Sequence, residues 1–372
     1  MSQPLTILLA GGGTGGHLYP GIAIAEAVRG MVPDARIVFL CSNREIDQVI
    51  LKPTGFESIQ QPIVPPRPSN LLRFFPSLFE TREVVRRALR EHKPAAVIGL
   101  GGFAAGVAVK MAARAGIYTL LLNPDVVPGR ANIYLLPHVQ AICCQFAASE
   151  GAIRPIYRSK VRVTGCPIRR DIRELPPRQE AAGRLGIDPL LSTLVITGAS
   201  QGAKTVNEAA LAVFASLTMN GWQVLHLSGR DHADCVRAGY RDLAIPAVVV
   251  DFTPAMADVW AVADLAISRS GASSCAELTA CGVPSLLMPY PFHKDLHQRK
   301  NAAVLAAAGA AIVIDDERDA VRNSEKLRVA IEPLLHDADR RAAMSAGARG
   351  IAKPDAADTI ARLVIDAVQE IG

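Results

Sequence analysis

Short apolar runs alternate along this chain with longer stretches in which apolar residues recur at helical spacing. Five runs in the first half are continuous enough to be buried strands, at residues 5–10, 36–41, 95–100, 117–122 and 139–144. Several end in glycine or polar loops that lead into helical stretches, as Gly101-Gly102-Phe103 does before residues 104–115. Buried strands that alternate with helices are typical of a parallel sheet covered on both faces.

The alternation lapses at residues 170–189, a charged stretch that contains Pro176-Pro177, and then starts again. Six further strands are predicted, at residues 193–197, 222–227, 247–252, 265–268, 285–288 and 311–314. We therefore predict an α/β protein with two doubly wound, Rossmann-like domains, over residues 1–165 and 166–354. A final helix over residues 355–372 is a candidate to pack back on the first domain. Because ligands of such sheets bind at the carboxyl ends of the strands, we expect the two domains to face one interdomain cleft.

Composition limits the class of protein. A length of 372 residues is enough for two domains of ordinary size. With 50% hydrophobic and 20% charged residues, the chain has the composition of a folded globular protein. No apolar run reaches the ~18–20 residues of a membrane-spanning helix, and the chain starts on a predicted core strand rather than on a signal peptide. The seven cysteines include no C-x-x-C pair, so we expect small core residues in a reducing cytosol rather than a structural metal or disulfides.

The net charge of +5 is unevenly placed. The segment 62–93 carries seven basic residues against three acidic ones, together with a cluster of large apolar side chains. The basic residues are Arg67, Arg73, Arg82, Arg86, Arg87, Arg90 and Lys93, and the apolar ones are Leu71, Leu72, Phe74, Phe75, Leu78 and Phe79. Such interleaving is typical of a surface that binds anionic lipid, although a solvated basic helix over an ordinary core has the same pattern. Nucleic-acid binding is disfavoured because no recognised binding motif accompanies the segment.

The first predicted strand leads into the run Gly11-Gly12-Gly13-Thr14-Gly15-Gly16-His17, and a helix with Pro20 in its first turn is predicted to follow. Glycines let the backbone approach a ligand closely, and a helix N-terminus offers free N–H groups and a positive dipole. His17 adds a titratable group, so the loop is predicted to be a wall of an active site. The glycine spacing also matches the dinucleotide fingerprint, but Ser42-Asn43-Arg44 follows the second strand in place of the expected acid. An NADP oxidoreductase therefore stays open as an alternative.

In the second half of the chain, the alternation of strands and helices begins again with a strand followed by a glycine loop at residues 198–202. Together with Lys204-Thr205, this loop nearly matches the P-loop motif. Ala203 occupies the place of the required second glycine, which disfavours nucleotide hydrolysis. The backbone N–H groups of the loop and the hydroxyl of Ser200 nevertheless suit a diphosphate.

Two later loops carry polar residues onto predicted helices. After the strand at 265–268, Ser270 and Ser273 are candidate helix caps, and Glu277 is placed to accept hydrogen bonds from a ribose diol. A glutamate on the surface of a helix that binds no ligand has the same sequence pattern. In the second loop, Gln298 and Asn301 occupy the first turns of a helix, where amides can bind sugar hydroxyls. His293 and His297 have i,i+4 spacing, but no further metal ligands accompany them.

Taken together, these residues resemble the lipid-linked N-acetylglucosaminyltransferase family of peptidoglycan synthesis (MurG), over nearly the whole chain. The matching pieces are Gly12-Gly13-Thr14-Gly15-Gly16-His17 with Pro20, Gly101-Gly102-Phe103, Gly165-Cys166-Pro167-Ile168-Arg169, Ser200-Gln201-Gly202-Ala203, Arg269-Ser270-Gly271-Ala272 with Glu277, and His293-Lys294-Asp295 with Gln298 and Asn301-Ala302. The resemblance implies a GT-B fold, with the acceptor mainly on the first domain and UDP-N-acetylglucosamine mainly on the second. It also implies an inverting transfer of N-acetylglucosamine to the 4-hydroxyl of N-acetylmuramic acid on undecaprenyl diphosphate, which converts lipid I to lipid II. A peripheral protein on the cytoplasmic side of the cell membrane is then expected, with residues 71–79 and the neighbouring arginines against anionic lipid.

The resemblance assigns roles by matching position. His17 would be the general base, and Thr14 would shape its loop. Arg169 and Ser200 would lie near the donor diphosphate or sugar, Glu277 would hold the ribose and Gln298 would bind sugar hydroxyls. The remaining predicted substrate-binding residues are Gly13, Gly15, Gly16, Asp125, Gln201, Gly202, Ser270, Gly271, Ala272 and Asn301. Neither a metal nor a cofactor is expected, because helix dipoles and an arginine can stabilise the departing UDP.

Two segments of the first domain depart from the family pattern. Leu122-Asn123-Pro124-Asp125 stands where the family carries His-Glu-Gln-Asn, and Phe103 and Ala105 stand where tyrosine and serine are usual. Both changes lie in the predicted acceptor domain. Two alternatives therefore stay open: a related UDP-sugar transferase with a different lipid or small-molecule acceptor, and a catalytically silent relative that binds a nucleotide sugar.

Overall fold

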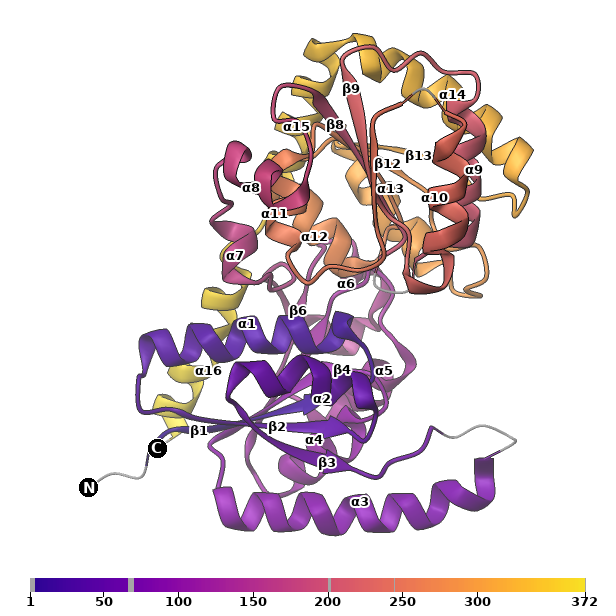
Figure 1. Cartoon of the computed structure of the whole chain (residues 1–372). Helices are drawn as coiled ribbons and strands as arrows, with labels where there is room; N and C mark the ends of the chain where they lie inside the picture. The colour runs from indigo at the N-terminus through magenta and orange to yellow at the C-terminus, as the bar shows by residue number, and fades with distance from the viewer. Residues whose placement is uncertain (1–3, 66–69, 200–201, 244, 372) are drawn as a thin grey trace. The chain divides into compact units, whose positions relative to one another are not determined.

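The computed structural model describes residues 4–65, 70–199, 202–243 and 245–371 (Figure 1). The chain divides into two compact units, one formed by Met1–Arg169 with Pro354–Gly372 and the other by Arg170–Lys353. Within the described residues, each unit is built on one sheet, of seven strands in the first and six in the second. The predicted α/β class with two doubly wound, Rossmann-like domains is confirmed. The division falls just after Arg169, slightly later than predicted.

The first sheet has the order β3-β2-β1-β4-β5-β6-β7, and all its neighbouring strands are parallel. Its strands are β1 (Thr6–Gly11), β2 (Arg36–Ser42), β3 (Glu57–Gln61), β4 (Ala96–Gly101), β5 (Tyr118–Asn123), β6 (Ala141–Cys144) and β7 (Val161–Val163). The strand order reverses between β1 and β4, which makes the carboxyl ends of these two strands the expected ligand site. The edge strands β3 and β7 were not predicted.

Helices cover both faces of this sheet because its inner strands are apolar on both sides. In β1, Ile7 and Leu9 belong to one core and Leu8 and Ala10 to the other, as alternation along a strand requires. The helices of the unit are α1 (Gly15–Met31), α2 (Glu45–Leu51), α3 (Leu71–His92), α4 (Ala105–Arg114), α5 (Arg130–Leu135), α6 (Ser149–Ala152) and α16 (Ala356–Ile371). The last of these, α16, packs beside α1 in the core that contains Ile7 and Leu9 (Figure 1).

Helix α1 begins earlier than predicted. Thr14 is extended, with φ −156° and ψ 155°, and the helix starts at the next residue. The prediction that Pro20 lies in the first turn is therefore wrong, because Pro20 lies inside the helix. The glycines of the loop thus form the helix N-terminus themselves, which places Gly15, Gly16 and His17 in its first turn.

The second sheet has the order β10-β9-β8-β11-β12-β13, again with parallel neighbours. Its strands are β8 (Ser192–Thr197), β9 (Trp222–Leu227), β10 (Ala247–Val250), β11 (Leu265–Ser268), β12 (Ser285–Leu287) and β13 (Ala311–Val313). The helices are α7 (Arg170–Arg173), α8 (Arg178–Leu185), α9 (Lys204–Phe214), α10 (Ala233–Arg241), α11 (Met256–Val262), α12 (Ala272–Cys281), α13 (His297–Ala307), α14 (Ala320–His336) and α15 (Ala338–Ile351). Here the order reverses between β8 and β11, so the loops after these strands mark the second expected ligand site.

Residues 71–92 of the basic segment form the amphipathic helix α3, which packs against α4 and β3, whereas Arg67 lies outside the described residues. Its inward face carries the buried Ser77, Thr81, Val85 and Ala88 at helical spacing. Among the described residues, no helix has the combination of length and apolar character needed to span a bilayer.

Candidate functional site

The switch point of the first unit holds His17 between two glycine loops. The ring lies against Gly101, the last residue of β4, and Gly102, which follows it. A Cβ atom on Gly101 would lie 3.1 Å from Cδ2 of the imidazole, and one on Gly102 would lie 3.1 Å from Cε1. Gly102 also has a φ of +71°, a conformation that favours glycine. These two positions therefore leave the room that the imidazole fills.

Hydrogen bonds select one tautomer of His17. Its Nδ1 lies 3.2 Å from the carbonyl oxygen of Gly12 and 3.2 Å from Oγ1 of Thr14. A carbonyl only accepts, so the contact with Gly12 requires the proton on Nδ1, which leaves the lone pair on Nε2. Burial lowers the pKa of His17 below its ordinary value of 6.5, while the Gly12 carbonyl and the charges of Asp125 and Asp47 act in the opposite direction. The neutral ring can then take up a proton at Nε2.

A buried carboxylate supports the loop that precedes His17. Asp47, in the first turn of α2, is fully buried and accepts from the backbone N–H of Gly13 at 2.7 and 3.0 Å. It also accepts from the backbone N–H and the hydroxyl of Ser42 at 2.9 and 2.7 Å. Sequence analysis missed Asp47. A signal was present, since an acid near the end of the second strand is part of the dinucleotide fingerprint, but here that acid binds the loop itself.

Asp125 lies in the loop after β5, in the segment that departs from the family pattern. The amide of Asn123 donates to the backbone oxygen of Asp125 over 2.8 Å and fixes this turn. A small hollow beside the first turn of α1 is lined by Asn123 and Pro124, by Gly16, and by Gly165 and Pro167 among others. Thr14, His17 and Asp125 are thus brought together at the carboxyl end of the first sheet, with Gly13, Gly15 and Gly16 in the same loop.

Arg169 belongs to the first unit, although the predicted boundary assigned it to the second domain. Its guanidinium lies over the ring of Tyr19 in α1, with Cζ 5.1 Å from the ring centroid. The cation is therefore held beside the helix that carries His17.

In the second unit, the loop after β8 packs closely against its neighbour. Gly202 has a φ of +71°, and a Cβ atom there would lie 2.3 Å from the backbone oxygen of Ser228. Only glycine fits this turn, which delivers the chain to Ala203 at the N-terminus of α9. The predicted diphosphate residues Ser200 and Gln201 lie outside the described residues.

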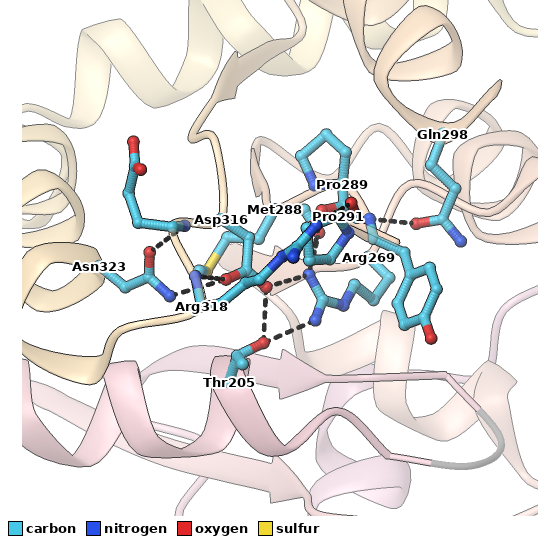
Figure 2. Close-up of polar contacts among 11 residues, drawn as sticks. Thr205, Arg269, Met288, Pro289, Pro291, Gln298, Asp316, Arg318 and Asn323 are labelled. Carbon is cyan, nitrogen blue, oxygen red and sulfur yellow. Dashed lines mark hydrogen bonds and ion pairs between the residues drawn. The ribbon is translucent and has the colours of Figure 1, made fainter. Parts of the chain in front are cut away.

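A buried ion pair joins the loops at the carboxyl end of the second sheet (Figure 2). Arg269, which follows β11, donates Nη1–H to Oδ2 of Asp316 over 2.9 Å and Nη2–H to Thr205 over 2.7 Å. Thr205 donates in turn to Oδ2 of Asp316 over 2.6 Å, and Asn323 donates to Oδ1 over 2.9 Å. The side chains of Arg269 and Asp316 are only 7% and 0% exposed.

The same guanidinium holds the loop after β12, because its Nη1–H also donates to the backbone oxygens of Met288 and Pro289, at 2.9 and 3.2 Å (Figure 2). Burial acts to raise the pKa of Asp316, but the bonds from Thr205, Asn323, the Arg318 N–H and Arg269 outweigh it and hold the pKa below its ordinary value. Arg269 is therefore an internal support of the site rather than a side chain presented to a ligand.

The turn after Arg269 is linked to the start of α13. Ser270 is fully buried and donates its hydroxyl to the backbone oxygen of Gln298 over 2.8 Å, while Asn301 donates its amide to the backbone oxygen of Ser270 over 3.1 Å. The predicted capping of α12 by Ser270 or Ser273 is wrong, because the N-cap is Gly271 and no side chain caps it. The small residues Gly271 and Ala272 instead bring the bare helix N-terminus to the end of β11.

Hydrogen bonds to neighbouring segments orient the side chains of Gln298 and Glu277. Oε1 of Gln298 accepts a hydrogen bond from the backbone N–H of Tyr290 over 2.9 Å (Figure 2). This bond orients the amide so that its NH₂ group points away from Tyr290 N–H. Oε2 of Glu277 accepts from the indole N–H of Trp260 over 2.8 Å. Asn301 differs from both, since it is fully buried and supports the turn at Ser270.

Both halves of this chain match models of a known protein family. The family model of the glycosyltransferase family 28 N-terminal domain matches residues 7–143, and that of the C-terminal domain matches residues 193–360. A protein of Halothermothrix orenii, named UDP-N-acetylglucosamine–N-acetylmuramyl-(pentapeptide) pyrophosphoryl-undecaprenol N-acetylglucosamine transferase, is 35% identical over 97% of this chain and 99% of its own length. A protein of the same name from Thermodesulfovibrio yellowstonii is 33% identical over 96% of this chain and 97% of its own length.

A solved structure shares the fold. The crystal structure of Acinetobacter baumannii MurG matches with a TM-score of 0.77 and 23% identity, over 98% of this chain and 100% of that one. Together with the full-length relatives above 30% identity, the paired family models and the two switch-point sites lead to one assignment: the chain belongs to the MurG family of N-acetylglucosamine transferases, within glycosyltransferase family 28.

Proposed function

We propose that this protein transfers N-acetylglucosamine from UDP-N-acetylglucosamine to N-acetylmuramyl-(pentapeptide) pyrophosphoryl-undecaprenol, the reaction for which its relatives are named. The observation that carries the proposal is the environment of His17, whose unprotonated Nε2 stands at the switch point of the first unit. An inverting transfer needs such a base for the acceptor hydroxyl.

In the proposed mechanism, Nε2 of His17 takes the proton of the acceptor 4-hydroxyl while that oxygen attacks C1 of N-acetylglucosamine. The bond between C1 and the phosphate oxygen breaks, and UDP leaves with the electron pair. The anomeric centre is inverted because attack and departure occur on opposite faces. Thr14 helps to orient the base, since its hydroxyl contacts Nδ1 of His17 and limits rotation of the imidazole ring.

The second unit is proposed to hold the donor. The N-termini of α9 and α12 carry bare N–H groups and positive dipole, which stabilise a departing diphosphate. Around them we place Gly202 with Ser200 and Gln201 at the diphosphate, and Gly271 and Ala272 at the nucleotide. The NH₂ group of Gln298 donates to sugar hydroxyls, and the carboxylate of Glu277 accepts from the ribose diol. Arg169 is a further cation that we propose for the donor diphosphate.

We further propose that α3 docks the protein on the cytoplasmic leaflet as a peripheral protein. Its outer face carries Leu72, Phe75 and Phe79 followed by Arg82 and Arg86, all exposed and spaced by three and four residues. Apolar side chains followed by arginines suit insertion into an anionic interface. The inner side of the helix reaches the candidate site, because Phe74 packs on Phe103 with ring centroids 6.0 Å apart. A lipid-linked acceptor held at α3 would therefore meet the loop that contacts His17.

The test is to incubate the purified protein with radiolabelled UDP-N-acetylglucosamine and a short-chain lipid I analogue. We expect labelled product from the native chain and none from His17→Ala, which should still bind UDP. Transfer to another lipid or small-molecule acceptor, but not to the analogue, would favour the related transferase with a different acceptor. UDP binding without transfer to any acceptor would favour the silent relative.

A further inference from the structure

We propose that Asp47 is the positioning residue for His17 and acts through a single peptide group, that between Gly12 and Gly13. The inference deepens the proposed function, because it rests on His17 as the general base. Neither the sequence motifs nor the family resemblance assigned Asp47 a role.

The relay follows from which atoms belong to which peptide. The carbonyl of Gly12 accepts from Nδ1–H of His17, and the N–H of Gly13 donates to the carboxylate of Asp47. These two groups are the C=O and N–H of one planar trans peptide, so they point in opposite directions. The carboxylate therefore fixes the plane of the peptide on one side, and the peptide fixes the imidazole on the other. A chain of hydrogen bonds also polarises each member, which makes the Gly12 carbonyl a stronger acceptor.

The surroundings leave the carboxylate little freedom. Both oxygens of Asp47 are engaged by Gly13 and Ser42. A Cβ atom on Gly12 would lie 2.2 Å from Oδ2 of Asp47, so the loop must be glycine for the carboxylate to approach. Arg44 holds the next peptide, donating Nη1–H to the carbonyl of Gly13 over 3.1 Å. The loop is thus fixed on both sides of Gly13.

The relay has an electrostatic consequence for the base. The charged groups at the loop are Asp47 from α2, Asp125 from the loop after β5 and Arg44 from the loop after β2. The charges of both aspartates favour protonated His17 and so raise its pKa against the effect of burial. Removing the charge of Asp47 should lower the pKa of His17. It should also weaken the constraint that keeps the proton of the neutral imidazole on Nδ1.

The decisive variant is Asp47→Asn, which keeps the side-chain shape but replaces one acceptor oxygen by an NH₂ group that faces a donor N–H. We expect kcat to fall about ten- to a hundredfold, as when the partner that orients a functional histidine is lost. The KM for UDP-N-acetylglucosamine should stay unchanged, and the acid limb of the kcat/KM profile should move to lower pH. Ser42→Ala is the matched control, since it removes one donor to Asp47 and leaves the peptide relay intact. Thermal unfolding and UDP binding check that each variant is folded.

A second measurement does not depend on the folding of Asp47→Asn. In the native protein labelled with ¹⁵N-histidine, the neutral form of His17 should carry its proton on Nδ1, with the signal assigned by its loss in His17→Gln. A neutral form with the proton on Nε2 would overturn the relay, as would Asp47→Asn with native kcat, pH profile and tautomer. If His17→Ala keeps full turnover, the base in the proposed function fails as well. If His17→Ala is inactive and Asp47→Asn is native-like, the relay alone fails.

Discussion

The indole nitrogen of Trp260 lies 2.8 Å from Oε2 of Glu277, and this hydrogen bond helps to orient a carboxylate on α12. Glu277 belongs to the helix whose bare N-terminus faces the proposed nucleotide site. Trp260 comes from α11, and the two helices pack against each other. A tryptophan from a neighbouring helix thus helps to orient the carboxylate that we propose binds the ribose.

This pair predicts two graded effects on donor affinity. Glu277→Gln should raise the KM for UDP-N-acetylglucosamine by about tenfold or more, because hydrogen bonds to a charged group contribute about 1.5–3 kcal/mol. Trp260→Phe should raise the KM less, since the carboxylate remains and loses only the hydrogen bond from the indole. Neither change should alter kcat at saturating donor. Steady-state kinetics with both substrates varied measures this, and a fall in kcat at unchanged KM would remove Glu277 from the ribose role.

The pH profile offers a test of Asp125. Its negative charge raises the pKa of His17, so Asp125→Asn should lower that pKa. A base with a lower pKa stays unprotonated to lower pH, and the acid limb of kcat/KM should therefore move down in pH. Asp34→Asn serves as the control, because Asp34 is exposed in the turn that follows the C-terminal end of α1. An acid limb that stays in place, or moves to higher pH, would contradict the prediction.

The stability of the second unit should depend on Asp316 far more than on its neighbour. Asp316→Ala leaves Arg269 as a buried, unpaired cation and should cost about 3–5 kcal/mol of unfolding free energy. Asp315→Ala removes only a surface pair with Arg299, whose partners are about half exposed, and should cost about 0–1 kcal/mol. Denaturant unfolding of both variants provides the comparison. Equal costs would show that the buried network carries no special weight.

The same network predicts a pH dependence. The folded-state pKa of Asp316 is lowered, so its contribution to stability is present above the ordinary pKa of an aspartate and is lost as pH falls through the folded pKa. The difference in unfolding free energy between the native protein and Asp316→Asn should therefore shrink as acid is added. A difference that stays constant down to the acid transition would speak against an ionised Asp316.

Membrane docking is tested by charge reversal on α3. Replacing Arg73, Arg82 and Arg86 by glutamate should weaken binding to vesicles of anionic lipid by at least about a hundredfold, given about 1 kcal/mol for each basic residue at such a surface. The matched control reverses Arg322, Arg328 and Arg340, which are exposed on the second unit and change the net charge equally. Vesicle sedimentation at low ionic strength reports both. Equal loss in the two variants would assign the effect to net charge instead of to α3.

The strands of both sheets could be predicted because inner strands of a parallel sheet are continuously apolar. Strands β9 and β11 were predicted with their observed bounds, and the bounds of the other predicted strands lie within two residues of the observed ones. The edge strand β3 was missed because its sequence, Glu-Ser-Ile-Gln-Gln, is polar and only Gln61 is buried. Strand β7 was missed because Arg162 and Val163, two of its three residues, are exposed, so it lacks the continuous apolar run of the inner strands.

The site could be predicted only as far as its local motifs. Glycine loops after strands located His17 and the turn at Gly271, since both depend on residues adjacent in the chain. The contacts that support these loops were not predicted, because they come from distant segments. Asp47 is 34 residues from Gly13 and Asp316 is 47 from Arg269. The dinucleotide fingerprint points to an acid near Asp47 but not to its contact with Gly13, and Asp316 has the sequence pattern of an ordinary surface residue. What a carboxylate contacts is decided by the strand order, which the hydrophobic pattern leaves open.

The place of α16 has a consequence for biosynthesis. Ile360, Ala361 and Val364 fill the core beneath α1, yet they are made after the whole of the second unit. The first part of the amino-terminal unit therefore leaves the ribosome before that core can be completed. The apolar side of α1 stays exposed while the second unit is translated and folds. Truncation by even a few terminal turns would leave the nascent protein permanently in this unfinished state, exposed to aggregation and to proteases.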